Sequence, residues 1–338
     1  MPLTTVSPGM LDTTAQYYSF KNRIINGDMR IDQRNAGASG TANGYTVDRF
    51  AYYGSQASKG TWQQNAGSVT PPTGFKNYLG FTASSAYSVL STDLFEIYQL
   101  IEGLNCIDLA FGTASASSVT FSFWVRSSLT GTFGGSLANS AGDRAYPFSY
   151  TISSANTWEQ KSITIAGDTT GTWLTTNGLG IQVRFGLGSG STYTGTANAW
   201  GSTNAIQPTG SVSVVGTSGA TFYITGVQLE KGSTATSFDY RPFGTELALC
   251  QRYYEVYYQD TGGVWPAAAY YNASNFFSYW AFKVEKRAQA TVTRVGGTWT
   301  GATPTLYNGI SSASFYASVQ FYLAASAGTK CLEAAAEL

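Results

Sequence analysis

Short segments in which apolar and polar residues alternate with a period of two run through most of the chain. The clearest is Val119–Ser127, which places Val119, Phe121, Phe123 and Val125 on one face and Thr120, Ser122, Trp124 and Arg126 on the other. A period of two is that of a β-strand with one buried face. Further β-rich segments, each bounded by Gly, Ser, Asn or Thr clusters, are Trp62–Gln64, Tyr78–Phe81, Phe95–Ile101, Tyr146–Ile152, Trp158–Ile165, Gly180–Phe185 and Ala220–Leu229. Many short antiparallel strands separated by turns predict an all-β fold, and we expect a jelly-roll β-sandwich over residues 22–243.

The stretch Thr221–Glu255 is expected to close this domain and to open another. After its initial strand, the segment Phe238–Phe243 should be extended, because the residue before a proline avoids helical geometry. Thr245 is expected to cap a short helix at this junction, with Glu246 in its first turn. The run RYYEVYY that follows again has the composition of a strand.

Residues 244–338 are therefore expected to form the junction helix and a small C-terminal β domain. Its strand-like segments RYYEVYY, SYWAFKVEKRAQATVTRV and ASFYASVQFYLAA are separated by glycine pairs and a proline. A domain of this size has a modest core, so we expect it to be stabilised by self-association. Residues 1–21 show little periodicity and are expected to form an extended N-terminal segment that does not pack alone.

The composition excludes several classes of function. Charged residues make up only 11% of the chain, whereas soluble domains usually carry about 25%. The formal net charge is +0, without a basic half, which argues against a nucleic-acid or acidic-membrane partner. The absence of histidine excludes His-dependent triads and His-ligated zinc sites.

The cysteines and the apolar runs bear on where the protein folds. Cys106, Cys250 and Cys331 are widely spaced and odd in number, so we expect small buried residues and no disulfide framework. That usage agrees with folding in a reducing cytoplasm. No signal peptide is recognisable, and no apolar run approaches the roughly 18 residues that a membrane span requires, so no membrane insertion is expected.

No catalytic residues are expected. Gly178–Gly180 and Gly186–Gly190 should be turns, since neither opens a helix in a βαβ unit and no Gly-Lys-Ser/Thr follows. Glu96, Glu102 and Asp108 form the most obvious cluster of carboxylates for glycoside hydrolysis, but their spacing sets no pair geometry. The alternative is that these side chains are only solvated or hydrogen-bonded.

Two parts of the sequence together carry a resemblance. RIINGDMRIDQRN and YTVDRF lie in the N-terminal block, and VQLEKG, DYRPF and RYYE lie around residue 240. This paired signature resembles tail-fibre and related structural proteins of tailed bacteriophages. More loosely, it is similar to jelly-roll carbohydrate-binding modules, in which an Asn-Gly-containing first strand lies beside a late V-x-L-E strand. The resemblance implies a virion location, attachment of residues 1–21 to other virion proteins, and a homotrimer.

The second resemblance also implies a structural calcium ion, held by oxygen ligands near the first and last strands. Asn26, Asp28 and Asp239 are the residues of suitable type at those positions. The alternative is that they are turn residues and inter-strand hydrogen-bonding residues. No other cofactor is expected.

Aromatic residues are the candidate ligand contacts. Sugars are bound by flat rings together with polar side chains, and the tryptophans of the predicted jelly roll are Trp62, Trp124, Trp158, Trp173 and Trp200. Alternation places Trp124 opposite the apolar face of its strand, which makes it the best single candidate. Core packing or a subunit interface is the alternative for each of these residues.

The sequence thus predicts a non-enzymatic virion protein, a tail fibre or similar appendage, that attaches to host cell-surface glycans. A capsid-decorating or head-fibre protein with an assembly role is the first alternative. A glycan depolymerase is the second.

Overall fold

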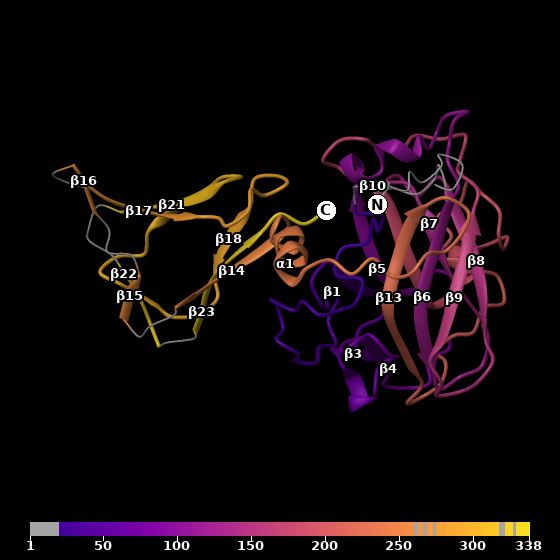
Figure 1. The fold of residues 1–338 in the computed structure, drawn as a ribbon. Helices are drawn as coiled ribbons and strands as arrows, with labels where there is room; N and C mark the ends of the chain where they lie inside the picture. Colours follow the sequence, from indigo (N-terminus) through magenta and orange to yellow (C-terminus); the bar gives the residue numbers. More distant parts are fainter. Residues whose placement is uncertain (1–19, 260–262, 266–268, 273–274, 318–321, 327–328) are drawn as a thin grey trace, which may run out of the picture. The chain divides into compact units, whose positions relative to one another are not determined.

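The computed structural model describes residues 20–259, 263–265, 269–272, 275–317, 322–326 and 329–338 (Figure 1). By its internal contacts the chain divides into two compact units. The first comprises Met1–Arg30, Gly37–Thr46 and Phe50–Arg241, and the second Ile31–Ala36, Val47–Arg49 and Pro242–Leu338. The second unit thus includes two short N-terminal segments that the sequence-based boundary at residue 243 had assigned to the first domain. The expected attachment segment, residues 1–21, lies outside the described residues except for its last two.

The first unit is a sandwich of two antiparallel sheets, which confirms the predicted all-β fold (Figure 1). The six-stranded sheet runs in the order β1 (Gly44–Tyr45), β2 (Phe50–Gly54), β5 (Leu94–Glu102), β10 (Leu179–Ser189), β7 (Gly131–Ala138), β8 (Ala145–Ile152). The five-stranded sheet runs β3 (Gly60–Gln64), β4 (Leu79–Ala83), β13 (Thr221–Lys231), β6 (Val119–Ser127), β9 (Glu159–Ile165). A short parallel pair, β11 (Thr194–Gly195) and β12 (Gln207–Pro208), and the 3₁₀ turns η2 (Ala66–Ser68), η3 (Gly103–Asn105), η4 (Ile107–Leu109) and η5 (Ser191–Tyr193) lie in the connections.

The core of the first unit lies between these sheets, and β6 shows why. All four residues of its predicted apolar face are fully buried. The Phe121 ring lies 5.2 Å from Phe148 of β8 and 5.5 Å from Phe185 of β10, and Phe123 lies 5.0 Å from Phe185. Such ring pairs add about 0.5–1.5 kcal/mol to the burial of their area. The alternation in the sequence therefore identified the face that joins the two sheets.

The first described residues run beside β13, as the resemblance implied, but they form bends and turns and not the expected first strand. The Asn22 side chain donates to the Val227 carbonyl at 3.0 Å and accepts from the Leu229 amide at 3.0 Å. The Val227 amide in turn donates to the Gly27 carbonyl at 2.9 Å. A Cβ at Gly27 would lie 2.1 Å from the Val227 carbonyl oxygen, so only glycine permits this close approach. The Asn-Gly pair and the V-x-L-E strand are thus parts of one backbone junction.

Replacing Gly27 with alanine should lower the free energy of unfolding of the first unit by about 1–3 kcal/mol, because a Cβ must displace the β13 backbone. Denaturant unfolding followed by circular dichroism measures the change. Gly178→Ala is the matched control: its Cβ would meet its nearest neighbours at 3.4 Å, so its effect should stay within about 0.5 kcal/mol. Equal effects of the two changes would refute the proposed role of Gly27.

The junction contains the helix α1 (Phe243–Gln251), and its start differs from the expectation. Pro242, with φ −54°, is the N-cap residue, and no side chain caps the helix. Thr245 therefore lies inside the first turn and does not cap it. The fixed φ of proline is already suited to the start of a helix, so no side-chain cap is needed to place it. Glu246 does lie in the first turn, as expected.

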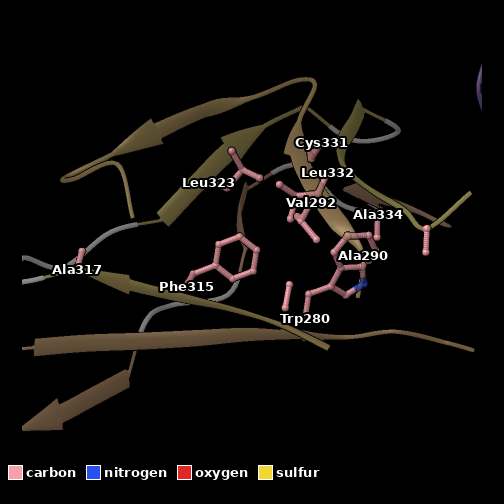
Figure 2. Close-up of a cluster of buried hydrophobic side chains, with 11 residues drawn as sticks. Trp280, Ala290, Val292, Phe315, Ala317, Leu323, Cys331, Leu332 and Ala334 are labelled. Carbon is pink, nitrogen blue, oxygen red and sulfur yellow. The ribbon is translucent and has the colours of Figure 1, made fainter. Parts of the chain in front are cut away.

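The described residues of the second unit form three small antiparallel sheets. One runs β14 (Tyr254–Gln259), β23 (Thr329–Ala335), β18 (Thr291–Arg294), and another β15 (Gly263–Trp265), β22 (Tyr322–Ala325), β19 (Thr298–Thr300). The third runs β16 (Ala269–Asn272), β17 (Asn275–Ala281), β21 (Ser312–Ala317), β20 (Thr305–Asn308). Figure 2 shows Trp280 and Phe315 pointing from β17 and β21 toward Val292 and Leu332, which come from the first of these sheets.

The N-terminal segments of the second unit bind the end of the chain. The Arg34 and Arg49 guanidinium groups both pair with Glu337, Arg34 at 2.6 Å. Arg49 also lies 3.5 Å over the Tyr253 ring, and Arg34 lies 3.6 Å over Tyr254. The two arginines and the two tyrosines belong to the RIDQRN, VDRF and RYYE parts of the sequence signature, so the signature residues also pack together within the second unit.

A buried ion pair joins three other segments of the second unit. Lys286 Nζ lies 2.6 Å from a Glu255 carboxylate oxygen, and both side chains have 0% exposure. The same ammonium donates to the carbonyls of Gln251, at 2.7 Å, and Val284, at 2.9 Å. The end of α1, the start of β14 and the segment after β17 are thereby held together by a fully bonded charge pair.

The three cysteines Cys106, Cys250 and Cys331 are buried and form no disulfide with one another. Burial raises the pKa of the Cys106 thiol to about 12, which makes it unreactive. Among the helices that the structure describes, none is long and apolar enough to cross a membrane.

Candidate functional site

Four aromatic side chains from distant parts of the first unit form a cluster. They are Phe111 after η4, Tyr146 on β8, Trp173 between β9 and β10, and Trp200 after β11. The Trp173 and Trp200 rings lie 5.5 Å apart, edge to face. Phe111 lies 4.9 Å from Trp173, and Tyr146 lies 5.2 Å from Trp200. We call these four residues the aromatic cluster; its two tryptophans are only partly buried.

Hydrogen bonds hold the two indoles in place. Trp200 Nε1 donates to the Ala166 carbonyl at 2.7 Å, and Trp173 Nε1 donates to the Thr170 carbonyl at 3.1 Å. With their N–H groups bonded to backbone carbonyls, the rings can offer their apolar surface to a ligand. The loops that carry them are therefore fixed by backbone contacts.

A bidentate ion pair secures the loop that carries Trp173. Arg144 Nε and Nη2 donate to the two Asp168 oxygens at 2.7 and 2.8 Å. Burial raises the pKa of Asp168, but the hydrogen bonds from Arg144 and Thr170 outweigh it and hold the pKa below its usual value. Gly171 has φ +77°, and a Cβ there would lie 2.4 Å from Arg144 Cγ. Glycine is thus required where this loop crosses the arginine side chain.

A recess of about 420 Å³ adjoins the cluster at Trp200. Its walls come from the outer face of β8 and from the segment around β11, and they consist of Ala145, Pro147, Thr194, Gly195, Thr196, Ala199, Trp200, Gly201, Ser202 and Thr203. A volume of this size is in the usual range of small-ligand sites, about 300–1,000 Å³. A second cavity, of about 10 Å³, lies by Phe111 and Trp173 and has room for no more than about one water. The larger recess is lined by one indole and by hydroxyl-bearing side chains, which suits a small polar ligand that also has C–H faces.

The other predicted tryptophans lie elsewhere. Trp62 is 7% exposed, its Nε1 donates to Ala42, and a Cβ at Gly40 would collide with its ring, so it is a packing residue. Trp158 lies 5.5 Å from the Tyr78 ring, edge to face, and donates to the Thr70 carbonyl.

Trp124, the favoured candidate, does lie opposite the core face of β6, but it is half-buried. A Cβ at Gly226 would lie 2.7 Å from the Phe75 ring and 3.1 Å from Trp124 Cδ1. Phe75 and Trp124 therefore both pack on the backbone of Gly226. The structure thus brings together Trp173 and Trp200, while Trp62, Trp124 and Trp158 lie apart from the cluster. Phe111 and Tyr146 were not singled out from the sequence. Their ring partners, Trp173 and Trp200, lie in loops, and loops leave no periodic signal in the sequence.

Two of the residues proposed for calcium, Asp28 and Asp239, lie beside arginine side chains. An Asp28 oxygen lies 3.2 Å from Arg30 Nε, and Asp239 accepts from the Asn22 amide and lies 3.9 Å from Arg241 Nε. Asn26 is fully buried, with φ 60°, in the turn before Gly27. Within the described part of the chain, no three Asp, Glu or Cys side chains are grouped so as to hold a metal ion. Asp28 and Asp239 thus each have an arginine beside them.

The carboxylates considered for hydrolysis do not line the recess. Glu96 and Glu102 lie at opposite ends of β5, which puts their backbones about 20 Å apart at roughly 3.3 Å per residue, whereas a glycosidase pair needs about 5–9.5 Å. Glu96 is buried 3.8 Å from Arg184 Nε. Burial raises its pKa, and the Arg184 charge lowers it only in part. Asp108 pairs with Arg23 at 2.7 Å. Glu96 and Asp108 thus each lie beside an arginine.

No protein-family model and no curated protein match the chain. Among solved structures, the enzymatically active domain of tailspike protein 4 of bacteriophage CBA120 is 10% identical, with 63% of this chain and 22% of that chain covered, at a TM-score of 0.33. The family 11 carbohydrate-binding module of the Clostridium thermocellum cellulase Lic26A-Cel5E is 12% identical, with 60% and 99% covered, at 0.29. The module TmCBM61, solved in complex with β-1,4-galactotriose, is 9% identical, with 62% and 99% covered, at 0.31. At these identities and TM-scores, the likenesses identify neither a family nor a ligand for this chain.

Proposed function

We propose that this chain is a non-enzymatic structural protein of a tailed-phage virion, a tail fibre or similar appendage, and that it attaches to host surface glycans. The observation that carries the binding part is the recess beside Trp200, where a half-buried indole adjoins hydroxyl-bearing walls. Sugars offer both hydroxyls and weakly apolar C–H faces, and this surface is complementary to both. The virion part rests on the paired sequence signature, several of whose residues the structure brings into contact within each unit.

Replacing Trp200 with alanine should weaken binding to host cells or to their isolated surface polysaccharide at least tenfold, because the ring forms a wall of the site. Binding of labelled protein to cells, with the melting temperature measured alongside, tests this. Trp158→Ala is the matched control: that indole is also half-buried, donates to a backbone carbonyl at 2.9 Å and packs edge to face on a tyrosine, but does not line the recess.

Equal losses of binding in the two variants would contradict the assignment of the site to the recess. Release of reducing ends from the polysaccharide by the unmodified protein would contradict the non-enzymatic part of the proposal.

We also propose that copies of the chain associate through the second unit, as a homotrimer, and that the N-terminal segment joins other virion proteins. The third sheet of the second unit supports self-association. Tyr279 on β17 and Tyr307 on β20 flank Ser314 on β21 in the strand register, and they are 60% and 59% exposed. None of the strands of this sheet carries a charged residue. A face of this kind is suited to burial against another protein surface.

Light scattering at micromolar concentration should therefore give about three times the chain mass of 36.0 kDa, since closed cyclic symmetry is the usual form of homo-oligomers. Tyr279→Lys should lower the mass of the assembly, because it places a charge on the face. A mass of one chain for the unmodified protein would contradict the proposed homotrimer.

A further inference from the structure

We infer that the recess beside Trp200 binds an uncharged sugar unit and discriminates against acidic sugars. The inference rests on the proposed glycan-binding function and adds to it the chemical class of the ligand.

The first argument is the charge of the walls. The recess is lined by Ala, Pro, Gly, Thr, Ser and Trp residues, and no Lys, Arg, Asp or Glu is among them. A carboxylate that loses part of its hydration in such a site finds no cation there to compensate its charge, which is unfavourable. A neutral sugar has no such requirement. The lining therefore accepts a neutral ligand more readily than an acidic one.

The second argument concerns the arginine that precedes β8 and the one on β10. Arg144, which precedes β8, gives two hydrogen bonds to Asp168, so its charge is already compensated. Arg184 of β10 is 4% exposed, donates to Asn204 at 2.6 Å and to Gln182 at 2.5 Å, and lies by Glu96. Neither arginine lines the recess, and both are engaged with protein groups. An acidic sugar would thus meet no guanidinium there.

The third argument is the match between the walls and a neutral sugar. Thr196, Ser202 and Thr203 supply hydroxyls, each of which can donate and accept hydrogen bonds, whereas the Thr194 hydroxyl already donates to the Ser191 carbonyl and accepts from Thr209. Sugar hydroxyls have the same dual character, so each can be satisfied in either direction. Trp200 supplies the apolar wall. A Cβ at Gly195 would lie 3.1 Å from Pro147 Cγ, so the β11 backbone lies directly on β8 at the side of the recess.

The test uses the full-length protein and defined probes. Methyl glycosides of glucose, galactose, mannose and N-acetylglucosamine are compared with glucuronic acid and N-acetylneuraminic acid by saturation-transfer NMR and tryptophan fluorescence titration. We expect at least one neutral glycoside to bind at least tenfold more tightly than either acid, and Trp200→Ala to abolish the signal.

Ala199 allows the charge of the wall to be changed in a variant expected to fold, because it is exposed and lines the recess. Ala199→Lys should raise the affinity for the acidic probes by up to about fivefold, as an exposed ion pair provides, and leave the affinity for neutral probes within twofold. Ala199→Asp should further lower the affinity for the acidic probes. Matched changes at Thr151, which is exposed on β8 and does not line the recess, should alter neither class.

The outcomes separate the two proposals. If the unmodified protein binds the acidic probes as tightly as the neutral ones, with the signal still dependent on Trp200, the inference is wrong and glycan binding stands. If it binds neither these probes nor host polysaccharide, the proposed function fails and the inference fails with it.

Discussion

Replacing Lys286 with methionine should lower the free energy of unfolding of the second unit by about 3–5 kcal/mol, the largest effect expected of any single change here. The substitution keeps most of the side-chain volume but leaves the Glu255 carboxylate, with 0% exposure, without its cation. Removing one partner of a buried pair leaves an uncompensated charge in a medium that solvates it poorly. It also leaves the carbonyls of Gln251 and Val284 without this donor. Denaturant unfolding of the intact chain, followed by tyrosine and tryptophan fluorescence, measures the loss.

Lys283→Met is the control for this change, because Lys283 is an exposed lysine in the same segment and only its backbone amide bonds Glu255, at 3.0 and 3.1 Å. Its effect should stay within about 0.5 kcal/mol. A loss below about 1 kcal/mol for Lys286→Met would show that water or a rearranged partner reaches Glu255.

Replacing Glu337 with alanine should cost about 3 kcal/mol in the same unit. Its carboxylate pairs with both Arg34 and Arg49, and the Arg49 side chain is 1% exposed. Without Glu337, the Arg49 guanidinium keeps the Tyr253 ring beneath it but loses its buried counter-ion. The loss should therefore exceed that of an ordinary surface pair, which is about 0–1 kcal/mol.

Glu333→Ala provides the comparison, because it removes the same side chain from the same end of the chain. Glu333 pairs with Lys330 at 3.2 Å, and its side chain is 26% exposed, against 11% for Glu337. Glu333→Ala should lower the free energy of unfolding by only about 1 kcal/mol, including the effect of losing the hydrogen bond from Tyr254. A larger loss for Glu333→Ala than for Glu337→Ala would contradict the importance given to the two arginines.

The parts of the fold that depend on local pattern were predictable. Alternation placed Phe121 and Phe123 on the core face of β6, because a strand exposes its faces in strict turn. Extended geometry before Pro242 and the helix after it also follow from local chemistry. The prediction that Thr245 caps the helix was wrong, since proline can start a helix without a side-chain cap.

The candidate site could be predicted only in part. Trp173 and Trp200 were among the tryptophans selected, but nothing in the sequence showed that these two meet, because they lie in separate loops whose paths depend on non-local contacts. Ring pairing with Phe111 and Tyr146, and the Arg144–Asp168 pair that fixes one loop, exist only after the sheets have formed. Trp124 was the favoured ligand contact because alternation places it opposite the core face of β6. Alternation does not show which side chains cover that outer face. Its partner on the Gly226 backbone, Phe75, comes from a different connection.

The inclusion of Ile31–Ala36 and Val47–Arg49 in the second unit has a consequence for synthesis on the ribosome. Arg49 meets its ion-pair partner Glu337 only after 288 further residues have been added. At about 5–20 residues per second this takes on the order of 15–60 s. During that time the two segments are present without the residues they bind, while the strands of the first unit are completed. The second unit is therefore expected to form after the first, and Ile31 and Val47, which are buried in the finished protein, lack their packing partners until then.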